Sequence, residues 1–238
     1  MKTLEQLDVK IFADGAELSG MLEMYTNPFI KGFTTNPTLM RKAGVSDYRA
    51  FAREVLDKIS DRPISFEVFA DEFDEMERQA TEIAGWGSNV FVKIPITNTR
   101  GESSQPVVRR LARAGVQLNV TALFTLEQVR EIGAALAGGP AAFVSIFAGR
   151  VADTGIDPLP LMRCAVKYLQ PSPNVELIWA SPRELLNIFH ADEVGCHVIT
   201  VTNDILKKLD LIGKDQREYS LDTVKMFHED GKKAGFVL

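Results

Sequence analysis

Short apolar segments alternate with longer amphipathic segments along the whole chain. The apolar segments have the length of β-strands, and a strand buried on both faces shows such a continuous run. The amphipathic segments repeat their apolar residues at the spacing of a helix that buries one face. We predict strands at residues 9–13, 30–34, 64–69, 90–94, 116–121, 142–147, 175–180 and 197–201, and helices at 47–60, 74–85, 105–114, 126–137, 159–170, 182–191, 203–211 and 220–234.

Three of the predicted helices begin next to residues that favour a helix start. The side chains of Ser46-Asp47 and Thr202-Asn203 can accept hydrogen bonds from the first free N–H groups of a helix. Ser181-Pro182 combines a capping residue with a proline, whose fixed φ suits the first helical turn. We therefore expect helices to begin at residues 47, 182 and 203.

Alternation of strands and helices is typical of parallel strands joined by helical crossovers. Eight such units in about 210 residues predict an α/β fold, a closed (β/α)8 barrel near the small end of its size range. The alternative is an open, doubly wound sheet, which more often carries a GxGxxG turn after its first strand. Here the first strand ends in Ala13-Asp14-Gly15-Ala16, without that turn. No long linker interrupts the pattern, so we expect residues 1–238 to form a single barrel domain with an additional C-terminal helix.

Composition and charge narrow the classes of function. The chain has 238 residues, 45 % of them hydrophobic, and a formal net charge of −5, which argues against a nucleic-acid binder with a basic stripe. The N-terminus has acidic residues where a signal peptide needs an apolar run, and no stretch of about 18 apolar residues could span a membrane. We therefore expect a cytoplasmic protein. The histidines are scattered at His190, His197 and His228, so we expect no metal site.

Polar residues interrupt four of the apolar strands at a regular spacing. Glu67, Lys93, Asn119 and Ser145 are each separated by 26 residues, about the length of one strand–helix unit. Strand side chains alternate between two faces, which puts these polar residues on one face and mainly aliphatic residues on the other. In a barrel the polar face is the lumen. We therefore expect the four residues to occupy equivalent positions in successive units.

A lysine and a glutamate inside a barrel are costly to bury unless they are paired or functional. One interpretation is a structural salt bridge between Lys93 and Glu67. The other is an active site, because a lysine in a partly apolar pocket loses hydration of its charged form. The neutral amine can then attack a carbonyl and form a Schiff base, whose protonated imine allows carbon–carbon cleavage without a metal or cofactor.

The sequence resembles the transaldolases, particularly the short-chain group that includes fructose-6-phosphate aldolase. The resemblance covers nearly the whole chain and follows the same order of motifs. Its elements are the Asp14 strand end, Thr34-Thr35-Asn36-Pro37-Thr38, Phe91-Val92-Lys93-Ile94-Pro95, Asn119-Val120-Thr121, Ser145-Ile146-Phe147-Ala148-Gly149-Arg150 and Ala180-Ser181-Pro182-Arg183.

The resemblance implies a role for each matched residue. Lys93 would form the Schiff base with C2 of a ketose, and Asp14 would take the C4 hydroxyl proton during cleavage. Glu67 and Thr121 would hold a water that moves protons while the carbinolamine loses water. The substrate-binding residues would be Thr35, Asn36, Asn119, Ser145 and Phe147, with Arg150, Ser181 and Arg183 on the terminal phosphate. A guanidinium beside a helix start at Ser181-Pro182 would suit an anion.

Two positions bear on the choice between transfer and aldol cleavage. The resemblance implies glutamine at position 67 and tyrosine at position 147 in the aldolase-type members, where this chain has Glu67 and Phe147. Without that hydroxyl, the enamine should persist until an aldehyde acceptor arrives. We therefore expect a transaldolase that moves a dihydroxyacetone unit between sugar phosphates. The alternatives are an aldolase that releases free dihydroxyacetone and a non-catalytic sugar-phosphate-binding barrel.

The resemblance also implies a homo-oligomer and a metabolic setting. Short-chain relatives form pentamers or decamers in which the C-terminal helix reaches a neighbour, and the helix at 220–234 with the tail Phe236-Val237-Leu238 would suit that use. A tail packed within its own chain is the alternative. The family implies the pentose phosphate pathway. Gly15, where relatives carry Thr or Ser, and the polar loop at 97–104 leave the donor ketose open.

Overall fold

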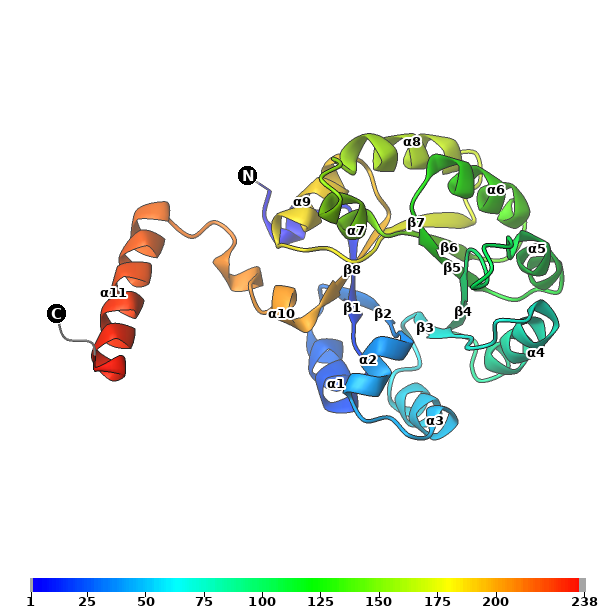
Figure 1. Cartoon of the computed structure of the whole chain (residues 1–238), viewed down its shortest axis with the longest axis horizontal. Helices are drawn as coiled ribbons and strands as arrows, with labels where there is room; N and C mark the ends of the chain where they lie inside the picture. Colours follow the sequence, from blue (N-terminus) through cyan, green and yellow to red (C-terminus); the bar gives the residue numbers. More distant parts are fainter. Residues whose placement is uncertain (1, 236–238) are drawn as a thin grey trace.

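The computed structural model describes residues 2–235 and contains a closed barrel of eight parallel strands in sequence order (Figure 1). The first and last strands pair in parallel, with Ile11 opposite Ile199, and this pairing closes the sheet. The strands are β1 (Lys10–Asp14), β2 (Ile30–Thr34), β3 (Ile64–Glu67), β4 (Val90–Pro95), β5 (Leu118–Leu123), β6 (Ala142–Ile146), β7 (Val175–Trp179) and β8 (Val198–Thr202). The predicted (β/α)8 barrel is confirmed, and the open sheet is excluded.

Helices surround the barrel and connect successive strands (Figure 1). They are α1 (Leu18–Thr26), α2 (Pro37–Lys42), α3 (Tyr48–Lys58), α4 (Phe73–Ala84), α5 (Gln105–Arg113), α6 (Leu126–Leu136), α7 (Ala148–Asp153), α8 (Leu159–Leu169), α9 (Leu186–Glu193), α10 (Asn203–Leu206) and α11 (Gln216–Ala234), with short 3-10 turns η1 (Leu4–Gln6) and η2 (Leu209–Leu211). All eight predicted strands are confirmed within two residues at each end.

The strands bury residues on both faces, which is why they form continuous apolar runs. On β4, Val92 and Ile94 are fully buried between the sheet and its helices. The opposite face points into the lumen, where the rings of Phe12, Phe91 and Phe143 pack together with Phe12 and Phe143 edge to face at 5.6 Å. Phe91 precedes Lys93 by two positions on the same face, so this apolar layer lies toward the amino-terminal end of the strands. The lumen is therefore filled below the polar layer.

Two of the predicted helix starts are confirmed within one residue and one is wrong. α3 begins after Asp47, whose carboxylate accepts a hydrogen bond from the Ala50 amide at 2.9 Å. α10 begins after Thr202. By contrast, the helix predicted after Ser181-Pro182 begins only at Leu186. Ser181 has a φ of 57°, in the left-handed region, so the chain turns there instead of entering a helix.

The predicted helix at 203–211 is divided into α10 and η2, and the last helix begins four residues earlier than predicted, at Gln216. Asp215 caps this helix by accepting hydrogen bonds from the amides of Arg217 and Glu218. The first turn of this helix is polar and has no apolar periodicity, so the sequence pattern did not indicate that the helix begins at Gln216. The helices α1, α2 and α7 were not predicted. α2 and α7 have six residues each, too few to show an apolar stripe, whereas α1 does carry one at Leu18, Met21, Leu22 and Tyr25.

Helix α11 stands away from the barrel at the far end of the chain, beyond α10 (Figure 1). Its apolar side chains are exposed, including Leu221, Val224, Met226 and Phe227. The helix ends at Gly235, whose φ of 67° forms a left-handed C-cap. The predicted apolar tail at Phe236-Val237-Leu238 lies outside the described residues. No helix within residues 2–235 is long and apolar enough to cross a membrane.

Candidate functional site

Lys93 lies in the middle of β4 with its side chain in the lumen, and only 7 % of the residue is exposed. Glu67 is paired with Lys93 in the β3–β4 register, so the two side chains are neighbours on the same face. The Nζ atom of Lys93 lies 3.8 Å from Oε2 of Glu67 and donates a hydrogen bond to the Thr35 carbonyl at 3.0 Å. Lys93 and Glu67 thus form an ion pair, which by itself fits both the structural and the active-site interpretation.

Asp14 ends β1 and is held by two neighbours from the β2 end of the barrel. Its Oδ1 accepts a hydrogen bond from the Thr34 hydroxyl at 2.7 Å, and its Oδ2 lies 3.5 Å from Nδ2 of Asn36. The other end of the Asn36 amide accepts from the Leu39 amide at 3.0 Å and caps α2. The cap therefore orients the Asn36 NH₂ group toward Asp14.

Burial raises the pKa of the Asp14 carboxyl, and the charge of Lys93 opposes that rise. Burial likewise raises the pKa of Glu67, with Lys93 lowering it and the charge of Asp14 raising it further. Two carboxylates that share a desolvated cavity with one amine resist full ionisation. Carboxyl groups whose pKa is raised by burial in a cavity are typical of sites that carry out acid–base chemistry.

A buried chain of hydrogen bonds crosses the lumen beside Lys93. Nδ2 of Asn119 donates to the Ser65 hydroxyl at 2.9 Å, and the Ser145 hydroxyl donates to Oδ1 of Asn119 at 2.7 Å. Asn119 is fully buried and is paired with Lys93 in the β4–β5 register. On β6, however, Asn119 pairs with Phe143, so Ser145 lies two residues further along. The predicted equivalence therefore holds for Asn119 and Lys93 but not for Ser145.

The hydroxyl of Thr121, unlike those of Ser65 and Ser145, takes no part in these hydrogen bonds. It is buried, yet it has no hydrogen-bond partner within residues 2–235. Thr121 follows Asn119 by two positions on the same face of β5, opposite Pro95 of β4. Since buried hydroxyl groups are normally hydrogen-bonded, this group fits a bound water or substrate.

These residues border a cavity of about 440 Å³ at the carboxyl ends of the strands, where barrel enzymes carry their active sites. Nine of the twelve predicted site residues line it: Asp14, Asn36, Glu67, Lys93, Thr121, Phe147, Arg150, Ser181 and Arg183. The other three, Thr35, Asn119 and Ser145, are buried and do not line the cavity. The structure therefore gathers most of the predicted set around one cavity.

Arg150 and Arg183 both line the cavity, but the surroundings of Arg183 differ from the prediction. Arg150 holds its guanidinium 5.0 Å from the centre of the Phe147 ring. Arg183 does not sit beside a helix start, because α9 begins only at Leu186. Instead, its guanidinium forms a bidentate ion pair with Asp153, with Nε 3.0 Å from Oδ1. The pair is half-exposed, so an anion at Arg183 must share the guanidinium with Asp153.

Two residues that line the cavity have an uncommon backbone conformation. Ala122 and Ser181 both line the cavity and both have positive φ values, 63° and 57°. Such conformations are uncommon for residues other than glycine and cluster at functional sites. Gly149 contacts the Ser181 backbone so closely that a Cβ at position 149 would lie 1.6 Å from the Ser181 carbonyl oxygen. This contact fixes the path of the chain around Ser181.

Comparison with known proteins identifies the family. The sequence model described as Transaldolase/Fructose-6-phosphate aldolase matches residues 11–237. This chain belongs to that family.

Relatives in this family cover most of the chain. A "Probable transaldolase" of Dehalococcoides mccartyi is 35 % identical over 202 residues, covering 84 % of this chain and 90 % of the relative. A "Probable transaldolase" of a Thermoanaerobacter species is 32 % identical over 228 residues, covering 95 % of this chain and 99 % of the relative. Dihydrodipicolinate synthase from Rhodopseudomonas palustris has the same fold, with a TM-score of 0.58 at 14 % identity over 93 % of this chain and 80 % of that one.

Some cavity residues of this family member were not predicted. Thr200 of β8 lines the cavity, and its hydroxyl bonds to that of Thr34, which in turn donates to Asp14. The alternation of β8 puts Thr200 and Thr202 on one face, so the same period-two analysis would have found them. Asp153 has no such signal, because its partner Arg183 is 30 residues away. Residues 2–235 contain no group of three or more His, Cys, Asp and Glu side chains that could hold a metal ion.

Proposed function

We propose that this chain is a transaldolase, which transfers a dihydroxyacetone unit from a ketose phosphate to an aldose phosphate through a Schiff base on Lys93. The observation that carries the proposal is a buried lysine 3.8 Å from Glu67, on the wall of a cavity that Asp14 also lines. A merely structural ion pair would not need a cavity of about 440 Å³ above it.

In the proposed mechanism, the neutral Nζ of Lys93 attacks C2 of the ketose, and the carbinolamine then loses water to give a protonated imine. Glu67 and Thr121, whose hydroxyl has no partner in the part of the chain that the structure describes, hold the water that carries protons in this step. Asp14 takes the proton of the C4 hydroxyl, the C3–C4 bond breaks, and an aldehyde leaves. The electron pair of that bond remains on the enamine, which the imine nitrogen stabilises.

The remaining residues hold the two ends of the substrate. Asn36 reaches the cavity beside Asp14 and can hydrogen-bond a substrate hydroxyl. Asn119 and Ser145 would contribute from below the cavity, where their mutual hydrogen bond already orders them. Arg150, Ser181 and Arg183 would hold the terminal phosphate on the opposite side. Guanidinium groups match phosphate oxygens in charge and geometry.

Phe147 favours transfer over release of free dihydroxyacetone. Its ring faces the cavity and carries no hydroxyl that could position a water for protonation of the enamine. The enamine therefore persists until it attacks the aldehyde of an acceptor. We propose that this reaction belongs to the interconversion of sugar phosphates, as in the pentose phosphate pathway, and that it takes place in the cytoplasm.

Trapping with borohydride tests the proposal. After incubation with fructose 6-phosphate and the reductant, mass spectrometry should find one three-carbon or six-carbon adduct on Lys93. Lys93→Met should abolish the adduct, whereas Lys10→Met, which removes a lysine paired with Glu176 at the amino-terminal end of the barrel, should keep it. No adduct with any of several ketose phosphates would leave the non-catalytic binding barrel as the better interpretation.

A coupled assay separates the two enzymes. With fructose 6-phosphate as donor, erythrose 4-phosphate should stimulate release of glyceraldehyde 3-phosphate strongly. If release is the same without the acceptor and free dihydroxyacetone accumulates, the chain is an aldolase.

We also propose that residues 1–238 work as a single barrel domain that assembles through α11, as a pentamer or decamer. The exposed Val224 and Phe227 on a helix that stands away from the barrel support this proposal. Val224→Glu/Phe227→Glu should lower the mass measured by light scattering to that of a monomer. An unchanged mass would remove α11 from the interface.

A further inference from the structure

The backbone of Glu67 lies at a point where the sheet lacks a strand partner. β2 ends at Thr34, and the last hydrogen bond between β2 and the β3 segment joins the Thr35 amide to the Ser65 carbonyl at 3.1 Å. Alternate residues of a strand direct their peptide groups to the same side, so those of Glu67 face the position where β2 has already ended. Buried peptide groups need partners, and here no strand supplies them.

The hydroxyl of Tyr48 occupies that position. It accepts a hydrogen bond from the Glu67 amide at 2.7 Å and donates one to the Glu67 carbonyl at 3.0 Å. On the other side, the Val68 amide donates to the Lys93 carbonyl at 3.1 Å. The end of β3 is therefore held between Tyr48 and the β4 backbone.

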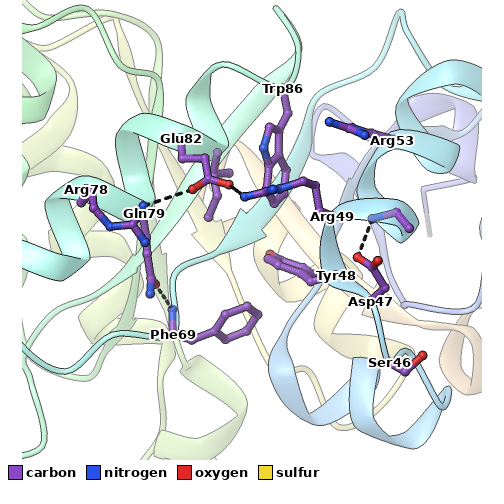
Figure 2. A pocket seen from close by; sticks show the side chains of 12 residues that line it. Ser46, Asp47, Tyr48, Arg49, Arg53, Phe69, Arg78, Gln79, Glu82 and Trp86 are labelled. Atoms are coloured by element: carbon purple, nitrogen blue, oxygen red, sulfur yellow. Dashed lines mark hydrogen bonds and ion pairs between the residues drawn. The ribbon is translucent and has the colours of Figure 1, made fainter.

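Tyr48 is itself held firmly by its surroundings. It is the first residue of α3, and its ring packs edge to face against Phe69 at 4.6 Å, Trp86 at 5.4 Å and Phe66 at 6.1 Å. Figure 2 shows Tyr48, Phe69 and Trp86 along the cleft of about 540 Å³ between α3 and α4. Burial raises the pKa of the Tyr48 hydroxyl, which keeps it protonated and able to donate.

The carboxylate of Glu67 depends on this backbone support. Within residues 2–235, its ion-pair partner is Lys93, at 3.8 Å, which is longer than a good hydrogen bond. Among the described residues no side-chain hydrogen bond fixes the carboxylate independently, so movement of the strand end moves it relative to Lys93. We propose that Tyr48 is a positioning residue, which holds Glu67 at the distance from Lys93 that the reaction needs. This inference rests on the proposed function of Glu67.

Tyr48→Phe removes the hydroxyl and keeps the ring. We expect the rate of Schiff-base formation to fall about 10- to 100-fold, because small displacements of a catalytic group cost this much. KM should change little, since Tyr48 does not line the cavity. Added to Glu67→Gln, the same substitution should cost almost nothing further. Tyr168→Phe is the matched control, because it removes a hydroxyl that bonds the Arg130 carbonyl and should leave the rate unchanged.

A second measurement on the unliganded protein does not depend on turnover. Amide hydrogen exchange should become faster at Glu67 in Tyr48→Phe, and the titration midpoint of the ¹³C-labelled Glu67 carboxyl should shift as its distances from Lys93 and Asp14 change. Neither should change in Tyr168→Phe. Unchanged exchange and titration in Tyr48→Phe would overturn the inference, as would losses that simply add to those of Glu67→Gln. Absence of any Lys93 adduct in the unmutated chain would instead defeat the proposed function.

Discussion

Thr121→Val should make the protein more stable and less active at the same time. The Thr121 hydroxyl is buried without a partner within residues 2–235, and valine has nearly the same shape. A buried polar group without a hydrogen bond costs about 1–3 kcal/mol. A water in the cavity offsets part of that cost, so we expect a gain of about 1 kcal/mol in the free energy of unfolding.

The size of the effect makes it measurable. For a chain of this length, a gain of about 1 kcal/mol raises Tm by about 2–4 °C. The same hydroxyl is proposed to hold the water that carries protons to the carbinolamine. Loss of one positioned group in proton transfer typically lowers the rate about 100-fold or more. We therefore expect kcat to fall by about two orders of magnitude.

Thr35→Val provides the control for the stability measurement. Its hydroxyl is equally buried but donates to the Ser65 carbonyl at 2.9 Å. Removing that hydrogen bond should lower the free energy of unfolding by about 1 kcal/mol. Denaturant unfolding of both variants therefore gives opposite signs. If Thr121→Val is destabilising and leaves kcat unchanged, Thr121 serves packing alone and the proposed water site is wrong.

Three further substitutions test the site. Phe147→Tyr should increase release of free dihydroxyacetone from fructose 6-phosphate in an assay without acceptor, and unchanged release would count against the role given to this ring. Asp14→Asn should abolish cleavage while stabilising the fold. Burial raises the pKa of Asp14 in the folded state above its value in the unfolded chain, which is about 3.9. The unfolded chain therefore loses this proton first, and the folded state loses stability as the pH rises above about 3.9. The stability advantage of Asp14→Asn should therefore grow between pH 4 and pH 8, and thermal unfolding would contradict this if the advantage shrank. Gly149→Ala puts a Cβ 1.6 Å from the Ser181 carbonyl oxygen and should cost about 1–3 kcal/mol or more, with a higher KM for sugar phosphates. Gly231→Ala, in open space on α11, should cost nothing by denaturant unfolding.

The barrel could be predicted from the sequence because each strand is buried on both faces. Val90–Pro95, for example, is apolar except for Lys93, and such a run has few alternatives. The helix start at Ser181-Pro182 was predicted wrongly, because a capping residue and a proline are present but the backbone of Ser181 is left-handed and the helix begins only at Leu186. Ser181 lies in the left-handed region, and its carbonyl approaches Gly149 so closely that only glycine fits there.

The candidate site was predictable where the signal was a polar residue inside an apolar strand. Lys93, Glu67 and Asn119 share one layer because the β3–β4 and β4–β5 registers follow their equal spacing. Ser145 departs from that layer, because the register between β5 and β6 is offset by two residues and spacing alone does not reveal register. The contact of Tyr48 with Glu67 joins residues 19 apart through a helix start, and no local pattern indicates it.

The overall charge of −5 says little about the ligand, because the charges that matter are those inside the cavity. Asp14 and Glu67 would outnumber Lys93 if both were ionised, and burial opposes that state by raising the pKa of each carboxyl. A carboxyl with a raised pKa is a better base when ionised and can also keep a proton to give away. In the proposed reaction, dehydration of the carbinolamine needs a group that gives a proton, and cleavage of the C3–C4 bond needs a base that takes the C4 hydroxyl proton. The burial that makes this group of charges costly to fold is therefore also what suits it to the proposed reaction.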